Sequence, residues 1–386
     1  MSANLAMVLD RVDKIADVIR DGAAESERLG HLAPAVIDAL HEADLFRILI
    51  PADLGGLALT LPESIAVFER VASHDASTGW TLAILADGPL FQRQLPRETF
   101  ATLCDPLGLV AGTANPATTR AEPVEGGFLF SGRASYLSGS AHAQWVMAAA
   151  LVMRDGQPAV SDAGIEIRAG LFPFELARCL DTWHVTGMRA TGSSDYAFEN
   201  VMVPTEMTFE PFRHNASSDD AFGAIPIWAL LGSGLTACTV GAARNMIDRF
   251  VELAAAKVPA GNFSRLCERA QAQIAVGEAE GLYLAARSVL TESVNTVWER
   301  GEAREPFDND VLARQRLGLV TAVKLAAQAI DLLHDAAGMN AVAADSVLDR
   351  CWRDVHTMTQ HIILSPARFE ICGRVLLGLD PASPVI

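Results

Sequence analysis

Apolar residues recur at helical spacing along the first part of the chain, and prolines mark where new helices begin. One stripe, which predicts the first helix, consists of Leu5, Val8, Val12, Ile15 and Ile19. Pro34 opens a second predicted helix and Pro62 a third, because proline is tolerated in the first turn of a helix. A fourth helix is predicted from Ser77 past Ile84. The chain up to about residue 105 is therefore expected to be helical.

The pattern changes to short apolar runs between about Gly108 and Pro204. Runs of this kind, bounded by glycine, proline or other turn residues, are typical of β-strands. They cover residues 109–113, 128–130, 145–152, 170–174 and 196–204. We therefore expect a β-domain in the middle of the chain.

Helical periodicity returns after a polar stretch. Residues 206–223 are mostly polar and predict a linker, and from residue 224 onward the apolar spacing is helical again. Interruptions are expected where glycine and proline gather, near 259–261, 301–306, Gly338 and Pro366. The periodicity thus predicts an α, β, α chain whose helical, β and helical domains cover residues 1–105, 106–205 and 206–386.

One uncharged stretch, residues 224–243, is long enough to cross a membrane. It also contains Pro226 and several glycine and hydroxyl residues, and no basic cluster flanks it. A helix buried in a bundle is therefore favoured over a membrane span. Near the amino end, Asp10 and Arg11 stand where a signal peptide would be apolar, so we expect a cytoplasmic protein without a membrane partner.

The composition narrows the class of protein further. Half of the 386 residues are apolar and 20% are charged, which favours a surface that is partly buried between subunits. The formal net charge is −17 and no basic run occurs, which disfavours nucleic acid as a partner. The six cysteines lack the spacing of a metal site or a disulfide framework, which indicates reduced thiols in a cytosolic enzyme.

Residues 181–204 contain the strongest candidate for a binding site. Residues 188–194 combine glycine and hydroxyl residues with Arg189, as in a backbone that approaches a polar ligand closely. The alternating run that follows predicts a strand ending at Pro204. Residues 232–237 match G-x-G-x-x-A, but their flanks are helical, so no nicotinamide site is predicted there.

Three segments together resemble the acyl-CoA dehydrogenase-fold flavoproteins. In that family G-x-R-x-T-x-S leads into a strand that ends F-x-N-V-x-V-P, as it does in residues 187–204. Residues 130–146 resemble the second signature of the family, a hydroxyl residue facing the flavin followed by A-Q-W. Residues 350–361 and 373–378 resemble one branch, the two-component flavin-dependent monooxygenases. The resemblance covers roughly residues 10–380.

The resemblance implies an α+β, mainly α fold: an N-terminal helical domain, a middle β-barrel domain and a C-terminal four-helix bundle, assembled as a homotetramer. It places Ser138 against the flavin ring as a catalytic hydrogen-bonding group, with Ser140 as its neighbour and alternative. Further flavin contacts are implied for Asn115, Arg189, Thr191 and Ser193.

Two departures distinguish the chain from the acyl-CoA dehydrogenases. Their catalytic carboxylate would fall at Ile362, and no acid follows before Glu370. Their Q-x-x-G-G motif for the adenosine end of FAD is replaced by His-Asp-Ala-Ala-Gly at residues 334–338. Both departures suit an enzyme that takes up a diffusible reduced flavin.

His361, beside the missing carboxylate, is the candidate catalytic base. An imidazole with a pKa near neutrality can remove a phenolic or N–H proton and return it. His356 would lie about 140° away around the same helix, so no metal site is expected from the pair. His74 and Trp80, together with His361, are expected to contact the substrate.

These expectations combine into one hypothesis and two alternatives. The resemblance implies the oxygenase component of a two-component monooxygenase, supplied with FADH2 or FMNH2 by a separate NAD(P)H-dependent flavin reductase. The reduced flavin would react with O2 to give a C4a-hydroperoxide, which Ser138 would hydrogen-bond while a small phenol- or indole-like substrate is hydroxylated. The alternatives are an acyl-CoA dehydrogenase or oxidase with a displaced base, and a non-catalytic helical assembly protein.

Overall fold

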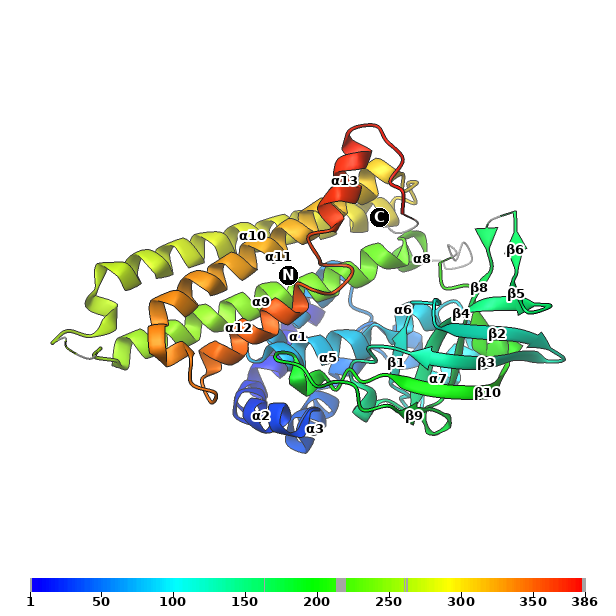
Figure 1. Cartoon of the computed structure of the whole chain (residues 1–386), viewed down its shortest axis with the longest axis horizontal. Coiled ribbons are helices and arrows are strands. Elements are labelled where there is room, and N and C mark those ends of the chain that lie inside the picture. Colours follow the sequence, from blue (N-terminus) through cyan, green and yellow to red (C-terminus); the bar gives the residue numbers. More distant parts are fainter. Residues whose placement is uncertain (1, 163, 213–219, 260, 262, 384–386) are drawn as a thin grey trace.

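A computed structural model describes residues 2–162, 164–212, 220–259, 261 and 263–383 of the chain. Helices come first, a β-sheet follows, and long helices complete the chain, which confirms the α+β, mainly α fold class (Figure 1). The sheet lies at one end of the molecule, and the long C-terminal helices run side by side at the other (Figure 1).

The N-terminal helices begin where capping residues and prolines stand. Their bounds are α1 (Ala3–Lys14), α2 (Ala16–Leu29), α3 (Pro34–Glu42), α4 (Leu61–Ala72), α5 (Ala76–Ala86), α6 (Gly88–Gln92) and α7 (Arg97–Cys104). The single stripe expected to form the first helix is divided between α1 and α2, because the backbone at Ile15 leaves the helical conformation. Thr60 and Glu63 form a capping box at the start of α4, and the Asp75 carboxylate accepts the N–H of Thr78 at the start of α5.

The strands form one mixed sheet and a small hairpin. Their bounds are β1 (Val110–Thr113), β2 (Thr119–Val124), β3 (Gly127–Ala134), β4 (Trp145–Arg154), β5 (Gln157–Pro158), β6 (Val160–Ser161), β7 (Gly164–Ile165), β8 (Ile167–Pro173), β9 (Arg178–Cys179), β10 (Tyr196–Pro204) and β11 (Thr208–Phe209). The main sheet has the order β11-β8-β4-β2-β3-β10-β9, with β1 and β5 also paired to β4. Strands β1 and β2 run parallel to β4, and the other pairs are antiparallel.

The C-terminal part is dominated by long packed helices. Their bounds are α8 (Ala221–Ala224), α9 (Ile227–Ala256), α10 (Ala270–Glu302), α11 (Asn309–Ala337), α12 (Val347–Met358) and α13 (Arg368–Leu376). The uncharged stretch 224–243 falls mostly in α9, whose first half is buried, as expected. By length and composition, the run Asn309–Ala341 could cross a membrane, but half of its apolar window is buried, and α11 packs on α9, α10, α12 and α13.

The polar segment expected to be a linker is more structured than the sequence indicated. It contains strand β11, which pairs with β8, and the short helix α8. Residues 213–219 of this segment lie outside the described residues. The expected linker therefore contains regular structure at both of its ends, while the domain limits at residues 105 and 205 stay a prediction.

Helix α9 approaches α4 closely because small residues stand at the contact. A methyl group on Gly241 of α9 would lie 2.3 Å from the carbonyl oxygen of Glu69 on α4, closer than any real contact. Helix α5 also packs on α9, and it touches β1 and the loop around residues 189–191. The close α4–α9 contact therefore helps to hold α5 between the helical bundle and the sheet.

We expect Gly241→Ala to lower the free energy of unfolding by about 1–3 kcal/mol, because the added methyl group overpacks the α4–α9 contact. The matched control is Gly373→Ala in α13, where no atom lies within 4 Å of the added methyl group. This control should be neutral or stabilise by up to about 1 kcal/mol, since alanine favours the helix. Urea unfolding of both variants measures the difference, and equal effects would show that the α4–α9 contact can relax.

Candidate active site

Two loops of the β-domain lie against each other and form the polar surface of the site. The first follows β3 and the second precedes β10. The N–H of Gly139 in the first donates to the carbonyl oxygen of Thr191 in the second at 2.8 Å. Left-handed backbone conformations at Tyr136 (φ 62°) and Met188 (φ 56°), rare outside glycine, turn the two loops toward each other.

A chain of hydrogen bonds connects buried hydroxyl groups across these loops. Trp80 Nε1 on α5 donates to Ser138 Oγ at 3.3 Å, Ser138 Oγ lies 2.7 Å from Ser193 Oγ, and Ser193 Oγ lies 2.6 Å from Thr191 Oγ1. The Thr191 hydroxyl donates to the carbonyl oxygen of Met188 at 2.8 Å. Because that carbonyl can only accept, the hydroxyl protons follow one direction, from Ser138 to Ser193 to Thr191. Ser138 Oγ is therefore left with an unused acceptor lone pair.

Ser140 takes part in a separate set of contacts nearby. Its hydroxyl donates to the carbonyl oxygen of Gly192 at 3.0 Å and accepts from the Tyr196 hydroxyl at 3.2 Å. Ser140 is buried and belongs to the same two loops. Each of the two serines therefore has a committed donor and one free acceptor lone pair, and Ser138 differs in its contact with Trp80.

His361 meets the hydroxyl chain through Trp80. The two rings make an edge-on contact with their centroids 5.4 Å apart. The N–H of Ile363 points to His361 Nδ1 at 3.3 Å, so Nδ1 is the acceptor and the proton of the neutral ring lies on Nε2. The sequence suggested that His356 and His361 lie on the same helix. Helix α12 instead ends at Met358, so His361 lies in the turn that follows it.

The charge state expected for His361 is wrong. Burial, together with the nearby cations Arg316 and Arg368, lowers the pKa of the His361 imidazole to about 4. Arg316 is itself buried and donates to the carbonyl oxygen of Ile363. An imidazole with this pKa is neutral from pH 6 to 9, so His361 offers an N–H donor there and does not titrate.

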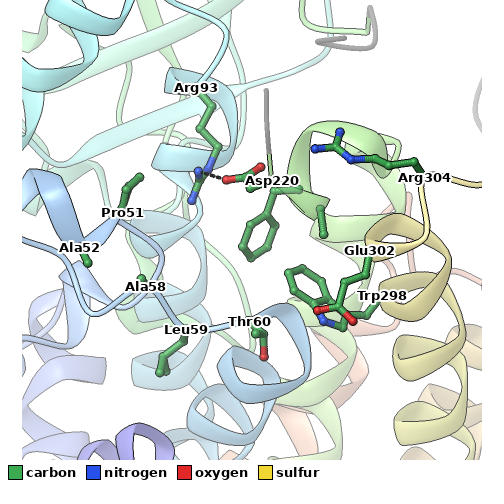
Figure 2. A pocket seen from close by; sticks show the side chains of 12 residues that line it. Pro51, Ala52, Ala58, Leu59, Thr60, Arg93, Asp220, Trp298, Glu302 and Arg304 are labelled. Atoms are coloured by element: carbon green, nitrogen blue, oxygen red, sulfur yellow. Dashed lines mark hydrogen bonds and ion pairs between the residues drawn. The ribbon is translucent and has the colours of Figure 1, made fainter. Parts of the chain in front are cut away.

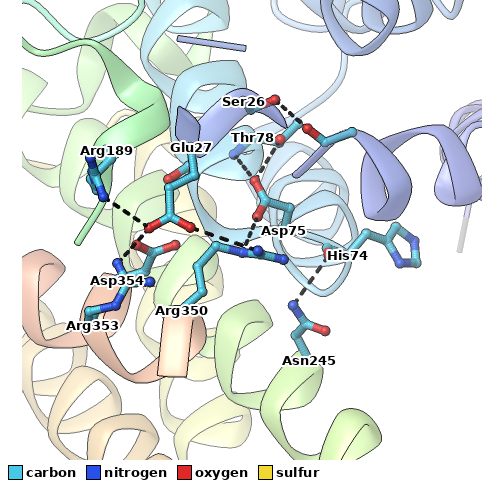
Figure 3. Close-up of polar contacts among 12 residues, drawn as sticks. Ser26, Glu27, His74, Asp75, Thr78, Arg189, Asn245, Arg350, Arg353 and Asp354 are labelled. Atoms are coloured by element: carbon cyan, nitrogen blue, oxygen red, sulfur yellow. Dashed lines mark hydrogen bonds and ion pairs between the residues drawn. The ribbon is translucent and has the colours of Figure 1, made fainter. Parts of the chain in front are cut away.

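An ion-pair network joins the site to the N-terminal helices (Figure 3). Glu27 of α2 lies 2.7 Å from Arg353, 3.9 Å from Arg350 and 4.0 Å from Arg189. Arg350 also lies 3.8 Å from the buried Asp75. The guanidinium group of Arg189, expected to contact flavin, therefore faces Glu27 and is half exposed.

Asp354 of α12 fastens the second loop to the helical bundle. Its Oδ1 accepts the main-chain N–H of Met188 at 2.5 Å, while its Oδ2 is buried and has no hydrogen-bond partner among the described residues. Burial and the neighbouring Asp75 raise the pKa of the Asp354 carboxyl to about 7, against the opposing effects of Met188 N–H and Arg350. A neutral or part-neutral carboxyl therefore holds the loop.

The structure thus gathers most, but not all, of the residues expected at the site. Ser138, Ser140, Thr191, Ser193, Trp80 and His361 lie within one set of contacts. Asn115 is an exposed turn residue whose Oδ1 accepts the N–H of Ala117. His74 lies against Arg20 and Asn245, and burial lowers its pKa to about 4. Within the described part of the chain, no hydrogen bond or ring contact links either residue with the hydroxyl chain.

Sequence reasoning missed the buried carboxyls Asp87 and Asp354 and the buried Arg316. A signal existed for Asp87, which stands alone in the apolar run 80–91. Asp354 and Arg316 lie on amphipathic helices, where a charged residue is normally taken to face solvent. Only the packing of α11 and α12 shows that these two residues face inward.

Comparison with known proteins finds one family at both ends of the chain. The acyl-CoA dehydrogenase N-terminal domain model matches residues 2–90, and the C-terminal domain model matches residues 233–366. The chain is 29% identical to an indole-3-acetate monooxygenase of Pseudomonas putida, over 96% of this chain and 94% of that one. It is 27% identical to the oxygenase component of an FADH2-dependent resorcinol hydroxylase of a Rhizobium species, over 97% and 95% of the two chains.

A solved structure agrees in fold. XiaF from a Streptomyces species, in complex with FADH2 and glycerol, superposes with a TM-score of 0.91 at 24% identity, over 99% of this chain and 98% of that one. The chain belongs to the acyl-CoA dehydrogenase family and, within it, to the oxygenase components of flavin-dependent monooxygenases. The resemblance of the chain to this branch is thereby confirmed.

We expect Asp354→Asn to be tolerated increasingly well as the pH rises. The folded pKa of Asp354 lies above its unfolded value, so the native state holds the extra proton and wild-type stability falls as pH rises from about 4 to 7. Asparagine keeps an oxygen for Met188 N–H and has no charge to bury. The stability of Asp354→Asn relative to wild type should rise by about 1–3 kcal/mol between pH 5 and pH 8.

Asp354→Ala is the matched control, because it removes the acceptor for Met188 N–H altogether. It should cost about 1–3 kcal/mol for the unpaired buried N–H. Urea unfolding at pH 5 and pH 8 tests both variants. A constant difference between Asp354→Asn and wild type would show that the carboxyl is ionised throughout this range.

Proposed function

We propose that this oxygenase component hydroxylates a small aromatic or heteroaromatic compound, phenol-like or indole-like, with O2 and a reduced flavin, FADH2 or FMNH2. A separate NAD(P)H-dependent reductase supplies the flavin, by diffusion or by docking. The observation that carries this proposal is the buried hydroxyl chain through Ser138, which ends on Trp80 beside a neutral His361. The names of the relatives, a resorcinol hydroxylase and an indole-3-acetate monooxygenase, support the substrate class.

The donor and acceptor pattern of the site fits a reduced flavin better than an oxidised one. A reduced flavin carries an N–H at N5, whereas the oxidised ring has a bare nitrogen there. Ser138 Oγ has an acceptor lone pair left over, and its proton is committed to Ser193. Ser138 would accept the flavin N–H, while the loop carrying Thr191, Ser193 and Arg189 would contact the rest of the cofactor. Bound reduced flavin supplies the electrons that activate O2.

The chain contributes orientation and the exclusion of water. Trp80, Ser138, Thr191 and Ser193 are each no more than 7% exposed, so polar groups bound there are shielded from solvent. His361 holds its proton on Nε2, where it can donate to an oxygen or heteroatom of the substrate and stabilise negative charge that develops on it. The apolar neighbours Ile363 and Trp80 suit an aromatic ring.

The dehydrogenase alternative is disfavoured by the site. Ile362, where a dehydrogenase would keep its carboxylate, is 64% exposed and points away from the core. The next acid, Glu370, is an exposed residue of α13. Neither residue belongs to the contacts around Ser138, so proton abstraction from an acyl chain has no base among the residues of that cluster.

A homotetramer in the cytoplasm is part of the proposal. Ile274 and Leu284 of α10 are 60% and 54% exposed, and Gly277 and Gly281 lie between them on the same side of the helix. A second copy of the chain could cover this apolar face. All six cysteines are free thiols and four are buried, which supports a reducing compartment.

We expect no product from the chain with NADH, oxidised flavin and substrate until a flavin reductase is added. With the reductase, and with 18O2 as the oxygen source, phenols and indoles should gain one labelled oxygen, detected by mass spectrometry. Ser138→Ala should lower the fraction of consumed O2 that appears in product by about a hundredfold, the typical worth of one preorganised donor or acceptor. Turnover with NADH and this chain alone would contradict the two-component arrangement.

We expect His361→Ala to reduce hydroxylation by about 10²–10³ to a similar degree at pH 6 and at pH 9, because the pKa of His361 lies far below this range. His361→Gln, which restores an N–H donor, should recover part of the loss. Wild-type activity should decline only in acid, as the imidazole is protonated near Arg316 and Arg368. If the wild-type hydroxylation rate changes between pH 6 and pH 8 and this change is absent in His361→Ala, His361 is instead a base that titrates in this range.

A further inference from the structure

The two loops of the site are held by the same kind of contact. Each loop turns through a residue other than glycine in the left-handed backbone conformation, Tyr136 in the first loop and Met188 in the second. The main-chain N–H of Met188 donates to the buried carboxyl of Asp354. The main-chain N–H of Tyr136 donates in the same way to Oδ1 of the buried Asp195, at 3.1 Å. The parallel indicates that Asp195 holds the first loop as Asp354 holds the second.

The Asp195 carboxylate is a rigid anchor for three residues of the first loop and its approach. Besides Tyr136 N–H at Oδ1, its Oδ2 accepts the Ser135 hydroxyl at 3.0 Å and Arg133 Nε at 2.6 Å. The residue is 5% exposed. Its own main chain is fixed on both sides, because its N–H donates to Thr182 Oγ1 at 3.0 Å and its carbonyl oxygen accepts the N–H of Leu180 at 2.8 Å. The carboxylate therefore cannot follow the loop if the loop shifts.

The conformation of Tyr136 depends on such main-chain contacts. Its side chain is 71% exposed, so burial of the ring does not enforce the left-handed backbone, which is disfavoured for a residue with a Cβ atom. The carbonyl oxygen of Tyr136 accepts the N–H of Ser138 at 2.9 Å. The backbone of Ser138 is thus connected through one residue to the Asp195 carboxylate.

The ion pair with Arg133 does not account for the buried carboxylate. The Arg133 side chain is 52% exposed, and pairs with an exposed partner contribute little to stability. A stabilising ion pair would also not need the contact with Tyr136 N–H, which is the contact closest to the hydroxyl chain.

We infer that Asp195 is a positioning residue, which acts through Tyr136 to place the Ser138 hydroxyl where its free lone pair accepts the N–H at position 5 of a reduced flavin. This inference rests on the proposed function. A hydrogen bond weakens steeply with distance and angle, so a shift of the first loop by about 1 Å would lose this contact. The other contacts of the flavin, made by the second loop, would remain.

The test compares reduced FMN and reduced FAD with their reduced 5-deaza analogues. The analogues carry a CH2 group in place of the N–H at position 5 and are otherwise alike, so they lack only the donor that Ser138 accepts. Dissociation constants are measured by calorimetry without oxygen and without substrate. Wild-type protein should bind the better of the two flavins about three- to tenfold more tightly than its analogue, the usual net effect of one hydrogen bond. Ser138→Ala should bind the two equally.

Asp195→Ala should also lose the preference for the flavin over its analogue. Asp195→Asn should keep most of it, because the amide oxygen still accepts Tyr136 N–H. Arg133→Gln is the matched control: it removes the ion pair, leaves the Tyr136 contact intact and should keep the wild-type preference. General disorder of the loop would weaken the binding of both ligands alike, so the ratio of the two dissociation constants reports the placement of the hydroxyl group and not stability.

An unchanged ratio in Asp195→Ala overturns the inference, and so does a wild-type protein without a preference. Loss of the preference in Arg133→Gln would assign the effect to the ion pair and overturns it as well. If Asp195→Ala does not fold, Asp195→Ser, whose side chain is too short to span both contacts, takes its place and must lose the preference. Hydroxylation by the wild-type protein with a reductase tests the proposed function separately: product can form while the ratio in Asp195→Ala stays unchanged, and the ratio can change even if no ring is hydroxylated.

Discussion

The site depends on the hydrogen bond between Met188 N–H and the buried Asp354 carboxyl. Met188 has the left-handed backbone conformation, which costs about 1–2 kcal/mol for a residue other than glycine, so other contacts must hold it. Its N–H is fixed by Asp354, and its carbonyl oxygen accepts both the Thr191 hydroxyl and Trp183 Nε1. Because that carbonyl is the last acceptor of the hydroxyl chain, the bond to Asp354 also sets the direction in which Ser138 presents its hydroxyl group. A contact between the bundle and the sheet thus determines the hydrogen-bonding character of the site.

Burial also shifts the pKa values of three ionisable side chains around the site, each in the direction that favours its neutral form. Burial and two arginines lower the pKa of the His361 imidazole, because they oppose a third positive charge, while burial raises the pKa values of the Asp87 and Asp354 carboxyls. Arg189, Arg350 and Arg353 face the Glu27 carboxylate (Figure 3), whereas Arg316 and Arg368 donate to backbone carbonyl oxygens. The large negative net charge of the chain therefore has little influence inside, and local donors and acceptors govern binding. The 450 Å³ cleft lined by Arg93, Asp220 and Trp298 belongs to another part of the molecule, between α8, α10 and the segment 51–60 (Figure 2).

The sequence predicted well whatever depends on local patterning. Prolines located α3 and α4, apolar residues located α5, and the family motifs pointed to Ser138, Thr191 and Ser193, which lie on two neighbouring loops. Features that depend on packing between distant segments were missed or misjudged. The pKa of His361 is set by Arg316 and Arg368, and the bond of Asp354 to Met188 spans the chain from α12 to the β-domain. No local pattern contains this information.

The difference between local motifs and packing of distant segments also explains why similarity to known proteins indicates the reaction more readily than the substrate. The hydroxyl chain is built from motif residues of two loops, and Trp80 and His361 complete it at one end of α5. At the other end of that helix lie Phe68 of α4, Gly234 of α9 and Asp87 at the end of α5, outside the loop motifs of residues 130–146 and 187–204. Substitutions outside these loops can alter the surroundings of a bound substrate without disturbing the loops that hold the hydroxyl chain. Relatives that share the reaction can therefore differ in substrate through residues that the loop motifs do not contain.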